Sequence, residues 1–290
     1  MAQKSVAIVT DSSAFLPEAL REQHGIYMIP LNLHWGEESL LDGVEITTDE
    51  FYRRLAEADA LPTTSQPSAG RFLELFEELA EEAESIVGVF ISSELSGTVA
   101  SANAAREMMA DFPIEIVDSR SASLGLGLIA IAAARAAEEG KDYHQVAETA
   151  RKLVPHTRVI FVVDTLEYLH KGGRIGGARR FLGSVLSIKP LLHLVDGKIE
   201  PLASVRTKRK AVEQMLSAIR EATAGAEALH MGVINAAVPD EGDALCDRIR
   251  GEFDPAELIQ GELSPVVGTH TGPGTLGVGF YDGAVLEADG

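Results

Sequence analysis

Three times in its first half, the chain passes from a short apolar stretch into a polar turn and then into a segment of helical character. The apolar stretches are Val6–Thr10, Ile86–Ser92 and Ile114–Val117, and serines, threonines or aspartates follow each of them. The helical segment after the third stretch, residues 122–138, is strongly apolar. Strand, polar turn and helix repeated in this order predict a parallel sheet with helices on both faces. We therefore expect a Rossmann-like α/β domain in the first half.

Two further helices are predicted between the first two of these units. Thr47 and Glu50 have the spacing of a capping box, which is typical of a helix start. Pro67 favours the first turn of a second helix, with Ser65 or Gln66 as its cap.

The second half has a different pattern, with a boundary predicted near Pro155. Leu191–Val195 and Ile199–Ala203 flank Asp196-Gly197, a pair that favours the type I′ turn of a β-hairpin. A helix over residues 207–222 and strands near 229–236, 257–262 and 278–281 are predicted to follow. The expected architecture is an α/β domain over residues 1–155 and an α+β domain with a mixed, partly antiparallel sheet over residues 156–290.

Composition narrows the cellular setting. The chain has 290 residues, of which 46% are hydrophobic, enough for a substantial core. A single cysteine, Cys246, fits a reducing compartment. The N-terminal apolar run is too short for a signal peptide, and no stretch approaches the roughly 20 apolar residues of a membrane span. We expect a cytoplasmic protein.

The formal net charge of −19 argues against general nucleic-acid binding, which requires a basic surface. The basic residues are unevenly placed, however. Residues 171–210 contain ten lysines and arginines and only two acids, Asp196 and Glu200. This segment is either a docking surface with phosphate contacts or an ordinary solvated face.

Hydroxyl side chains are concentrated in two segments, 63–68 and 92–98. Each segment precedes a predicted helix, so free backbone N–H groups and the positive end of a helix dipole would lie beside the hydroxyls. Gly97 would let a ligand approach the backbone closely. These features predict a site for a small oxyanion, although plain N-capping explains any single hydroxyl equally well.

His270 lies between two threonines in the segment 268–274, Gly-Thr-His-Thr-Gly-Pro-Gly, which Pro273 and the glycines predict to be an irregular loop. A histidine can donate a hydrogen bond and can also carry charge near neutral pH. We therefore add His270 and Thr271 to the candidate site.

Several common sequence motifs are either absent from this chain or lie in the wrong predicted structural context. Residues 125–130 fit GxGxxA but fall inside a predicted apolar helix, where small residues favour close packing. Residues 272–277 fit GxGxxG, but a strand rather than a helix follows. The sequence has neither a P-loop nor a GxSxG turn, and no spacing of His, Cys and carboxylates predicts a metal site. We expect no cofactor.

Seven short motifs, in order along nearly the whole chain, resemble the DegV family, whose members include FakB-type fatty-acid-binding proteins. Each motif is weak alone, and together they are specific. They are Val9-Thr10-Asp11-Ser12, Thr64-Ser65-Gln66-Pro67-Ser68, Ile91-Ser92-Ser93 with Leu95-Ser96-Gly97-Thr98, Val117-Asp118-Ser119, Leu169-His170-Lys171-Gly172-Gly173-Arg174-Ile175, Lys189-Pro190, and His270-Thr271-Gly272-Pro273-Gly274.

The resemblance implies a two-domain carrier that buries one long-chain fatty acid, such as palmitate, stearate or oleate, between its domains. It implies that hydroxyls matching Thr64 and Ser96 hold the carboxylate, with the histidine matching His270 nearby. The resulting candidate carboxylate site is Thr64, Ser65, Ser96, Gly97, His270 and Thr271.

The resemblance also implies a partner, a separate fatty acid kinase that phosphorylates the bound carboxylate for phospholipid synthesis. Basic loops matching Arg174 and Arg206 would face this exchange surface. We expect no catalytic residue in such a carrier, and transient contact with a membrane surface.

Two other functions remain open from the residues alone. Ser96 could be the nucleophile and His270 the base of an acyl hydrolase or transferase, with Asp11 or Asp118 as the orienting acid. Alternatively, the chain could be a regulatory binder that acts through residues 171–210.

Overall fold

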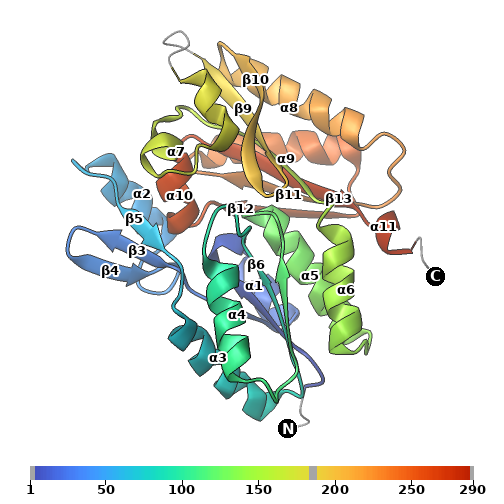
Figure 1. Cartoon of the computed structure of the whole chain (residues 1–290). Coiled ribbons are helices and arrows are strands. Elements are labelled where there is room, and N and C mark those ends of the chain that lie inside the picture. The colour runs from blue at the N-terminus through green and yellow to red at the C-terminus, as the bar shows by residue number, and fades with distance from the viewer. Residues whose placement is uncertain (1–3, 183–187, 288–290) are drawn as a thin grey trace.

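The computed structural model describes residues 4–182 and 188–287, and its first half is built on a parallel sheet (Figure 1). The strands lie in the order β2 (Ile26–Ile29), β1 (Ala7–Asp11), β6 (Ile86–Phe90) and β7 (Ile114–Asp118). All of their pairings are parallel. Their carboxyl ends, with the polar turns that follow, therefore meet at one edge of the sheet.

Helices cover both faces of this sheet. One pair is α3 (Ala69–Glu82) and α4 (Thr98–Met108), and the other is α5 (Leu124–Glu138) and α6 (Tyr143–Leu153). The faces alternate along β1, because Val9 packs in one core cluster with Phe72 of α3, whereas Ile8 belongs to the cluster that contains α5. The short helices η1 (Ser12–Ala14) and α1 (Glu18–Gln23) follow β1.

The second half contains a mixed sheet, as predicted. Its strands lie in the order β10 (Lys198–Val205), β9 (Lys189–Val195), β8 (Arg158–Val162), β13 (Leu276–Asp282), β11 (Leu229–Asn235) and β12 (Glu257–Glu262). β11 and β12 are parallel, and the other neighbours are antiparallel. The fold class predicted from the sequence is thereby confirmed. The boundary between residues 155 and 156 falls between α6 and β8, and it stays a prediction.

The two faces of the mixed sheet have different neighbours. Helices α8 (Lys208–Ala222) and α9 (Pro239–Phe253) pack on the face that presents Ile160 and Val162. The opposite face presents Val159 and Phe161, next to the short helices α7 (Glu167–Lys171) and η2 (Gly176–Phe181). This second face borders the candidate site described below. The described chain ends in α11 (Ala284–Glu287).

Helix α5 joins the two halves, because it packs on β1 of the first sheet and also on β11 and β13 of the second. A Cβ atom on Gly125 would collide with Val159 of β8, and one on Gly279 would press against the backbone of Gly125. Glycines thus permit the close approach of α5 to the mixed sheet, which confirms the packing role predicted for residues 125–130.

A third, antiparallel sheet lies to one side of the parallel sheet (Figure 1). It has the order β4 (Glu38–Leu41), β3 (Asn32–Trp35) and β5 (Thr63–Ser65), and α2 (Thr48–Ala56) connects β4 to β5. Thr47 caps α2 as predicted, since its hydroxyl accepts a hydrogen bond from the Glu50 backbone N–H, but only this half of the predicted capping box is found among the described residues. Among the described residues, no helix is long and apolar enough to cross a membrane.

Two local predictions were wrong. The helix after Pro67 begins at Ala69 and is capped by Ser68, because Ser65 lies in β5, paired with Asn32. His270 lies in the last turn of a helix, α10 (Pro265–Thr271), rather than in a loop. The hydroxyl of Ser264 caps α10, and the irregular segment begins only at Gly272.

Candidate functional site

A cavity of about 830 Å³, including the part open to solvent, lies between the two halves of the chain. Segments from the carboxyl edge of the parallel sheet, from β5, from α10 and from the inner face of the mixed sheet contribute to its wall. Its polar lining residues are Ser13, Thr64, Ser65, Gln66, Ser96, Ser123, Arg174, His270, Thr271 and Thr275, and the remaining ones are apolar.

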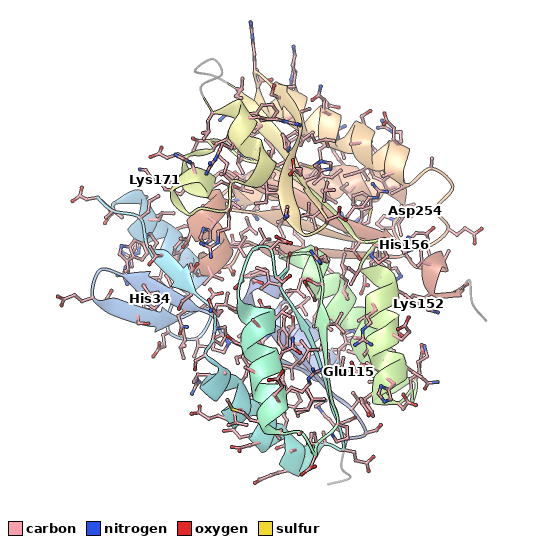
Figure 2. The ribbon with its side chains drawn as sticks, viewed as in Figure 1. His34, Glu115, Lys152, His156, Lys171 and Asp254 are labelled. Carbon is pink, nitrogen blue, oxygen red and sulfur yellow. The ribbon has the colours of Figure 1, made fainter. Side chains whose placement is uncertain are left out.

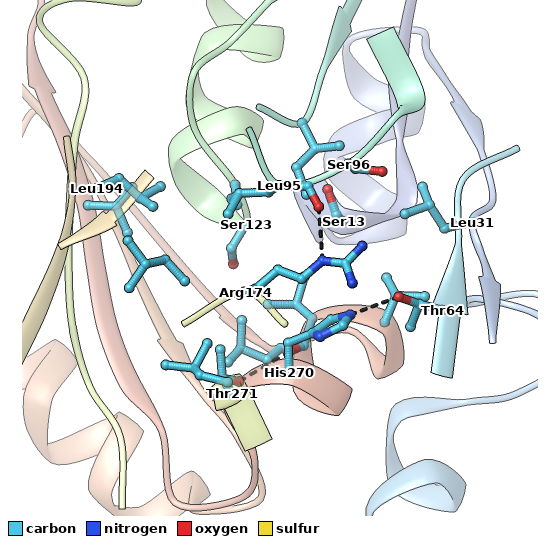
Figure 3. Close-up of a pocket in the computed structure, with 18 of the residues that line it drawn as sticks. Ser13, Leu31, Thr64, Leu95, Ser96, Ser123, Arg174, Leu194, His270 and Thr271 are labelled. Carbon is cyan, nitrogen blue, oxygen red and sulfur yellow. Dashed lines mark hydrogen bonds between the residues drawn. The ribbon is translucent and has the colours of Figure 1, made fainter. Parts of the chain in front are cut away.

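The centre of the polar part is a hydrogen bond between His270 and Thr64 (Figure 3). The Nε2 atom of His270 lies 2.7 Å from the Thr64 hydroxyl oxygen, although 206 positions separate the residues in sequence. Burial, together with the nearby charge of Arg174, lowers the pKa of His270 to about 4. The imidazole is therefore neutral at neutral pH and carries a single N–H group.

Arg174 reaches into the cavity between Ser96 and Thr64 (Figure 3). Its Nε atom donates to the Leu95 carbonyl at 3.1 Å, and Nη1 donates to the Gly172 carbonyl at 2.8 Å. These bonds fix a half-buried cation beside the two hydroxyls. The arrangement provides a positive charge and several hydrogen-bond donors for an anion.

Ser96 lies in the turn before α4, and Gly97 caps this helix without a side-chain hydrogen bond. The Ser96 hydroxyl is 2.9 Å from that of Thr98. Gly97 packs against Gln66, because a Cβ atom there would approach its side-chain amide to within 2.8 Å. The structure therefore brings Ser96 to the cavity wall and gives Gly97 a packing role beside it.

The remaining predicted residues are placed as follows. Ser65 lines the cavity, and its hydroxyl is within 2.8 Å of His34 Nε2. Thr271 also lines the cavity and donates to the Val267 carbonyl at 3.3 Å. Arg206 is exposed after β10 and is not one of the lining residues. The structure thus brings together all the predicted carboxylate-site residues except Gly97, which lies directly beside them, and it leaves Arg206 outside.

Three lining hydroxyls, those of Ser13, Ser123 and Thr275, were not among the predicted site residues. Ser13 lies in the turn after β1 and donates to Asp11, a fully buried carboxylate that also accepts from the Ile91 N–H at 2.8 Å. Burial raises the pKa of Asp11 to about 6. Ser123 precedes α5 with a φ of +52°, which is unusual for a residue other than glycine. The turn after β1 was a sequence signal for Ser13, whereas no local pattern indicates Ser123.

Ser96, His270 and an acidic residue do not form the hydrogen-bonded triad of a serine hydrolase. His270 Nε2 is bonded to Thr64 rather than to Ser96, and its buried Nδ1 atom has no partner among the described residues. Asp118, one of the acids considered for the orienting role, instead accepts from Ser93 and the Arg120 N–H. The other, Asp11, holds Ser13.

A depression of about 1370 Å³, including the part open to solvent, shares Thr64, Arg174 and His270 with the cavity. Lys171 borders this depression at the outer edge of the molecule and pairs with Glu167 at 2.6 Å (Figure 2). The basic segment 171–210 therefore begins beside the polar end of the cavity. Residues 183–187 of that segment lie outside the described part of the chain.

Comparison with known proteins places these features in a family. The model of the DegV family of uncharacterised proteins matches residues 5–283. A DegV domain-containing protein of Streptomyces coelicolor is 42% identical over 278 residues, which is 95% of this chain and 98% of that protein.

Several solved structures are similar to this chain over nearly its whole length. A fatty-acid-binding DegV family protein of Thermus thermophilus matches with a TM-score of 0.91 and 36% identity, covering 96% of this chain and 99% of that one. DegV of Bacillus subtilis, a fatty-acid-binding protein, matches with a TM-score of 0.89 and 32% identity, covering 97% and 100%. A stearic-acid-binding protein of Eubacterium ventriosum matches with a TM-score of 0.89 and 27% identity, covering 96% and 98%.

Proposed function

The chain belongs to the DegV family, and we propose that it binds one long-chain fatty acid, such as palmitate, stearate or oleate, in the cavity between its two halves. The observation that carries this proposal is a largely apolar cavity whose hydroxyls, imidazole and guanidinium meet around Thr64, Ser96, Arg174 and His270. A ligand with one anionic end and a long apolar chain fits this distribution. Related proteins that bind fatty acids support the same class of ligand.

The contact between His270 and Thr64 orients the carboxylate clamp. If Nε2 carries the single imidazole proton, it donates to the Thr64 oxygen, and the Thr64 O–H is then free to donate to a carboxylate. Ser96 contributes a second hydroxyl, and Arg174 offsets the negative charge. Hydrogen bonds to a charged group contribute about 1.5–3 kcal/mol each, which fixes the direction of the ligand.

The acyl chain contributes most of the affinity. Palmitate has about 14 methylenes, and burial of each contributes about 0.8 kcal/mol, or about 11 kcal/mol before the cost of association. A net charge of −19 repels a fatty acid anion at long range, so its attraction must come from local donors and from the apolar wall.

We propose further that the chain presents the bound carboxylate to a separate fatty acid kinase in the cytoplasm. The carboxylate oxygen would attack the γ-phosphate of ATP on the kinase, yielding an acyl phosphate for phospholipid synthesis and ADP. The depression that shares Thr64, Arg174 and His270 with the cavity supports access from this side. Arg174 would steady the reacting end, Arg206 would contact the partner, and transient contact with a membrane surface would allow the lipid to be exchanged.

Native mass spectrometry of the purified protein, followed by solvent extraction and lipid analysis, tests the carrier function. We expect one long-chain fatty acid per chain. Ser96→Ala should weaken binding about tenfold or more, because it removes a donor to a charged group. Ser93→Ala is the matched control, since the Ser93 hydroxyl donates to Asp118 and does not line the cavity. A chain that stays at its apo mass and takes up no added fatty acid would refute the proposal.

A further inference from the structure

The apolar part of the cavity is separated from a second hollow by only a few side chains. This outer groove lies on the surface between the end of α6, the start of β8 and the β9–β10 hairpin. Val159 and Leu194 line both the cavity and the groove. Leu194 lies across the cavity from Thr64 (Figure 3), so the groove adjoins the end remote from the proposed carboxylate clamp.

The wall between the two hollows coincides with a gap in the mixed sheet. The antiparallel pairing of β8 with β9 runs from Val162 and Leu191 to Ile160 and His193. Val159 and Leu194 are the next residues on the two strands, and they no longer pair. Side chains rather than ladder hydrogen bonds therefore close the cavity at this point.

The turn of the β9–β10 hairpin contacts the other half of the molecule. The hairpin turn reaches the first half of the chain, where the Ser92 hydroxyl donates to the Gly197 carbonyl at 2.9 Å. Arg120 Nη1 donates to the Asp196 carbonyl at 3.1 Å. Two hydrogen bonds thus tie the tip of the hairpin to the first half of the chain.

The outer groove offers apolar surface that continues beyond the wall. Leu202 and Val195 line it and are 39% and 40% exposed, two of the few large apolar side chains with such exposure among the described residues. Val154 and Ala218 add to this surface. Charged residues also line the groove, but an acyl methyl end needs only the apolar strip between them. They are Arg120, Arg158, Asp196 and Glu221.

We infer that Val159 and Leu194 set the length of acyl chain that the cavity accepts, and that a longer chain would pass between them into the outer groove. The inference rests on the proposed fatty acid binding and assigns the methyl end of the ligand to this wall. Palmitate would end within the cavity. A smaller side chain at position 194 would join the cavity to the groove and favour the binding of longer fatty acids.

Competitive loading tests this inference directly. Wild type, Leu194→Ala and Leu182→Ala would each be equilibrated with an equimolar mixture of myristic, palmitic, stearic, arachidic and behenic acids, and the bound acids quantified by mass spectrometry. Leu182→Ala is the matched control, because Leu182 is an exposed leucine that lines neither the cavity nor the groove. We expect Leu194→Ala to raise the ratio of bound behenate to palmitate about tenfold, as burial of about two more methylenes would. The control should change it less than about twofold.

The outcomes separate the inference from the function on which it rests. An unchanged ratio in a folded Leu194→Ala protein, or an equal rise in both variants, would overturn the role of the wall while leaving fatty acid binding intact. A wild-type protein that loads none of the five acids would overturn the proposed function itself. Val159→Leu provides the opposite test, since it should thicken the wall and lower the ratio of stearate to myristate about fivefold. An unchanged ratio there would also count against the inference.

Discussion

The two ends of the cavity are built differently. At one end, the Thr64–His270 bond and the bond from Arg174 to the Leu95 carbonyl join residues from segments far apart in sequence. At the other end, Val159 and Leu194 meet through side-chain packing where strand pairing has stopped. Hydrogen bonds require defined distances and angles, whereas apolar burial depends mainly on area. The polar end should therefore determine which group binds and in which direction, and the apolar end how much of the chain is buried.

The sharpest test of this division compares octanoate with palmitate. Both acids present the same carboxylate, so the clamp treats them alike. Palmitate has about eight more methylenes, each contributing about 0.8 kcal/mol on burial, which predicts a dissociation constant about 10⁴-fold lower than that of octanoate. Isothermal titration of the delipidated protein below the concentration at which palmitate self-associates would measure it. A difference below about tenfold would mean that the acyl chain is not buried.

A smaller effect is expected from changing the clamp alone. Thr64→Val keeps the shape of the side chain but removes the hydroxyl that links His270 to the proposed carboxylate position. The loss of one hydrogen bond to a charged group predicts about 10- to 100-fold weaker palmitate binding, with the order of chain-length preference unchanged.

Thr63→Val is the control for this substitution, because Thr63 is on the same strand and exposed, and it does not line the cavity. Binding of a fatty alcohol should respond to Thr64→Val much less than binding of palmitate does. Equal losses for the two ligands would show that Thr64 supports the cavity wall rather than the carboxylate.

The same contrast explains what the sequence could predict. Asp196-Gly197 indicated the hairpin because this pair favours a type I′ turn, in which both residues have positive φ. The observed φ values, +48° and +81°, agree with that turn. The hydroxyls at Thr64 and Ser96 were identifiable because each lies in a short hydroxyl-rich segment before a predicted helix, and because these segments resemble motifs of the DegV family. The signals were local or chemically distinctive, so they could be recognised without knowledge of the fold.

The apolar end had no comparable signal. Val159 belongs to an ordinary buried strand pattern, and nothing in that pattern distinguishes a side chain facing a cavity from one packed in the core. The three-residue strand β5 was also missed, because its pairing with Asn32–His34 is long-range. Only the packing of the two halves shows where apolar residues leave space.

The pH dependence of stability provides a further comparison, because only the polar end titrates. The pKa of His270 falls to about 4 in the folded protein, below the usual value of about 6.5 for the unfolded chain. The neutral form is favoured by folding, so this contribution is complete above about pH 6.5 and is lost as the pH falls toward 4. Between about pH 7.5 and 5, the free energy of unfolding should fall about 2 kcal/mol more for the wild type than for His270→Gln.

Urea unfolding of the lipid-free proteins would measure this difference. Asp11 and Asp42 act in the opposite direction, because burial raises the pKa of both carboxyls and favours their protonated forms in the folded state. Their contribution to stability is present at low pH and is lost as the pH rises through the pKa values of these carboxyls in the folded protein. Because the wild type and His270→Gln both contain these carboxyls, the contribution cancels when the two proteins are compared. Parallel pH curves for the wild type and His270→Gln would show that the histidine is not buried as a neutral group.

The smallest effect on affinity is expected at Arg206, outside both ends of the cavity. Its side chain is exposed and does not line the cavity, so Arg206→Ala should change palmitate affinity less than about twofold. If Arg206 contacts a fatty acid kinase, the rate of acyl phosphate formation at limiting kinase should fall about fivefold, since an exposed charge at an interface mainly affects association. The matched control is Arg71→Ala, which removes an exposed arginine of α3 that is 58% accessible and pairs with Glu74. Equal rates for the wild type and Arg206→Ala would remove Arg206 from the proposed docking surface, whereas a loss of palmitate affinity would place it within the binding site.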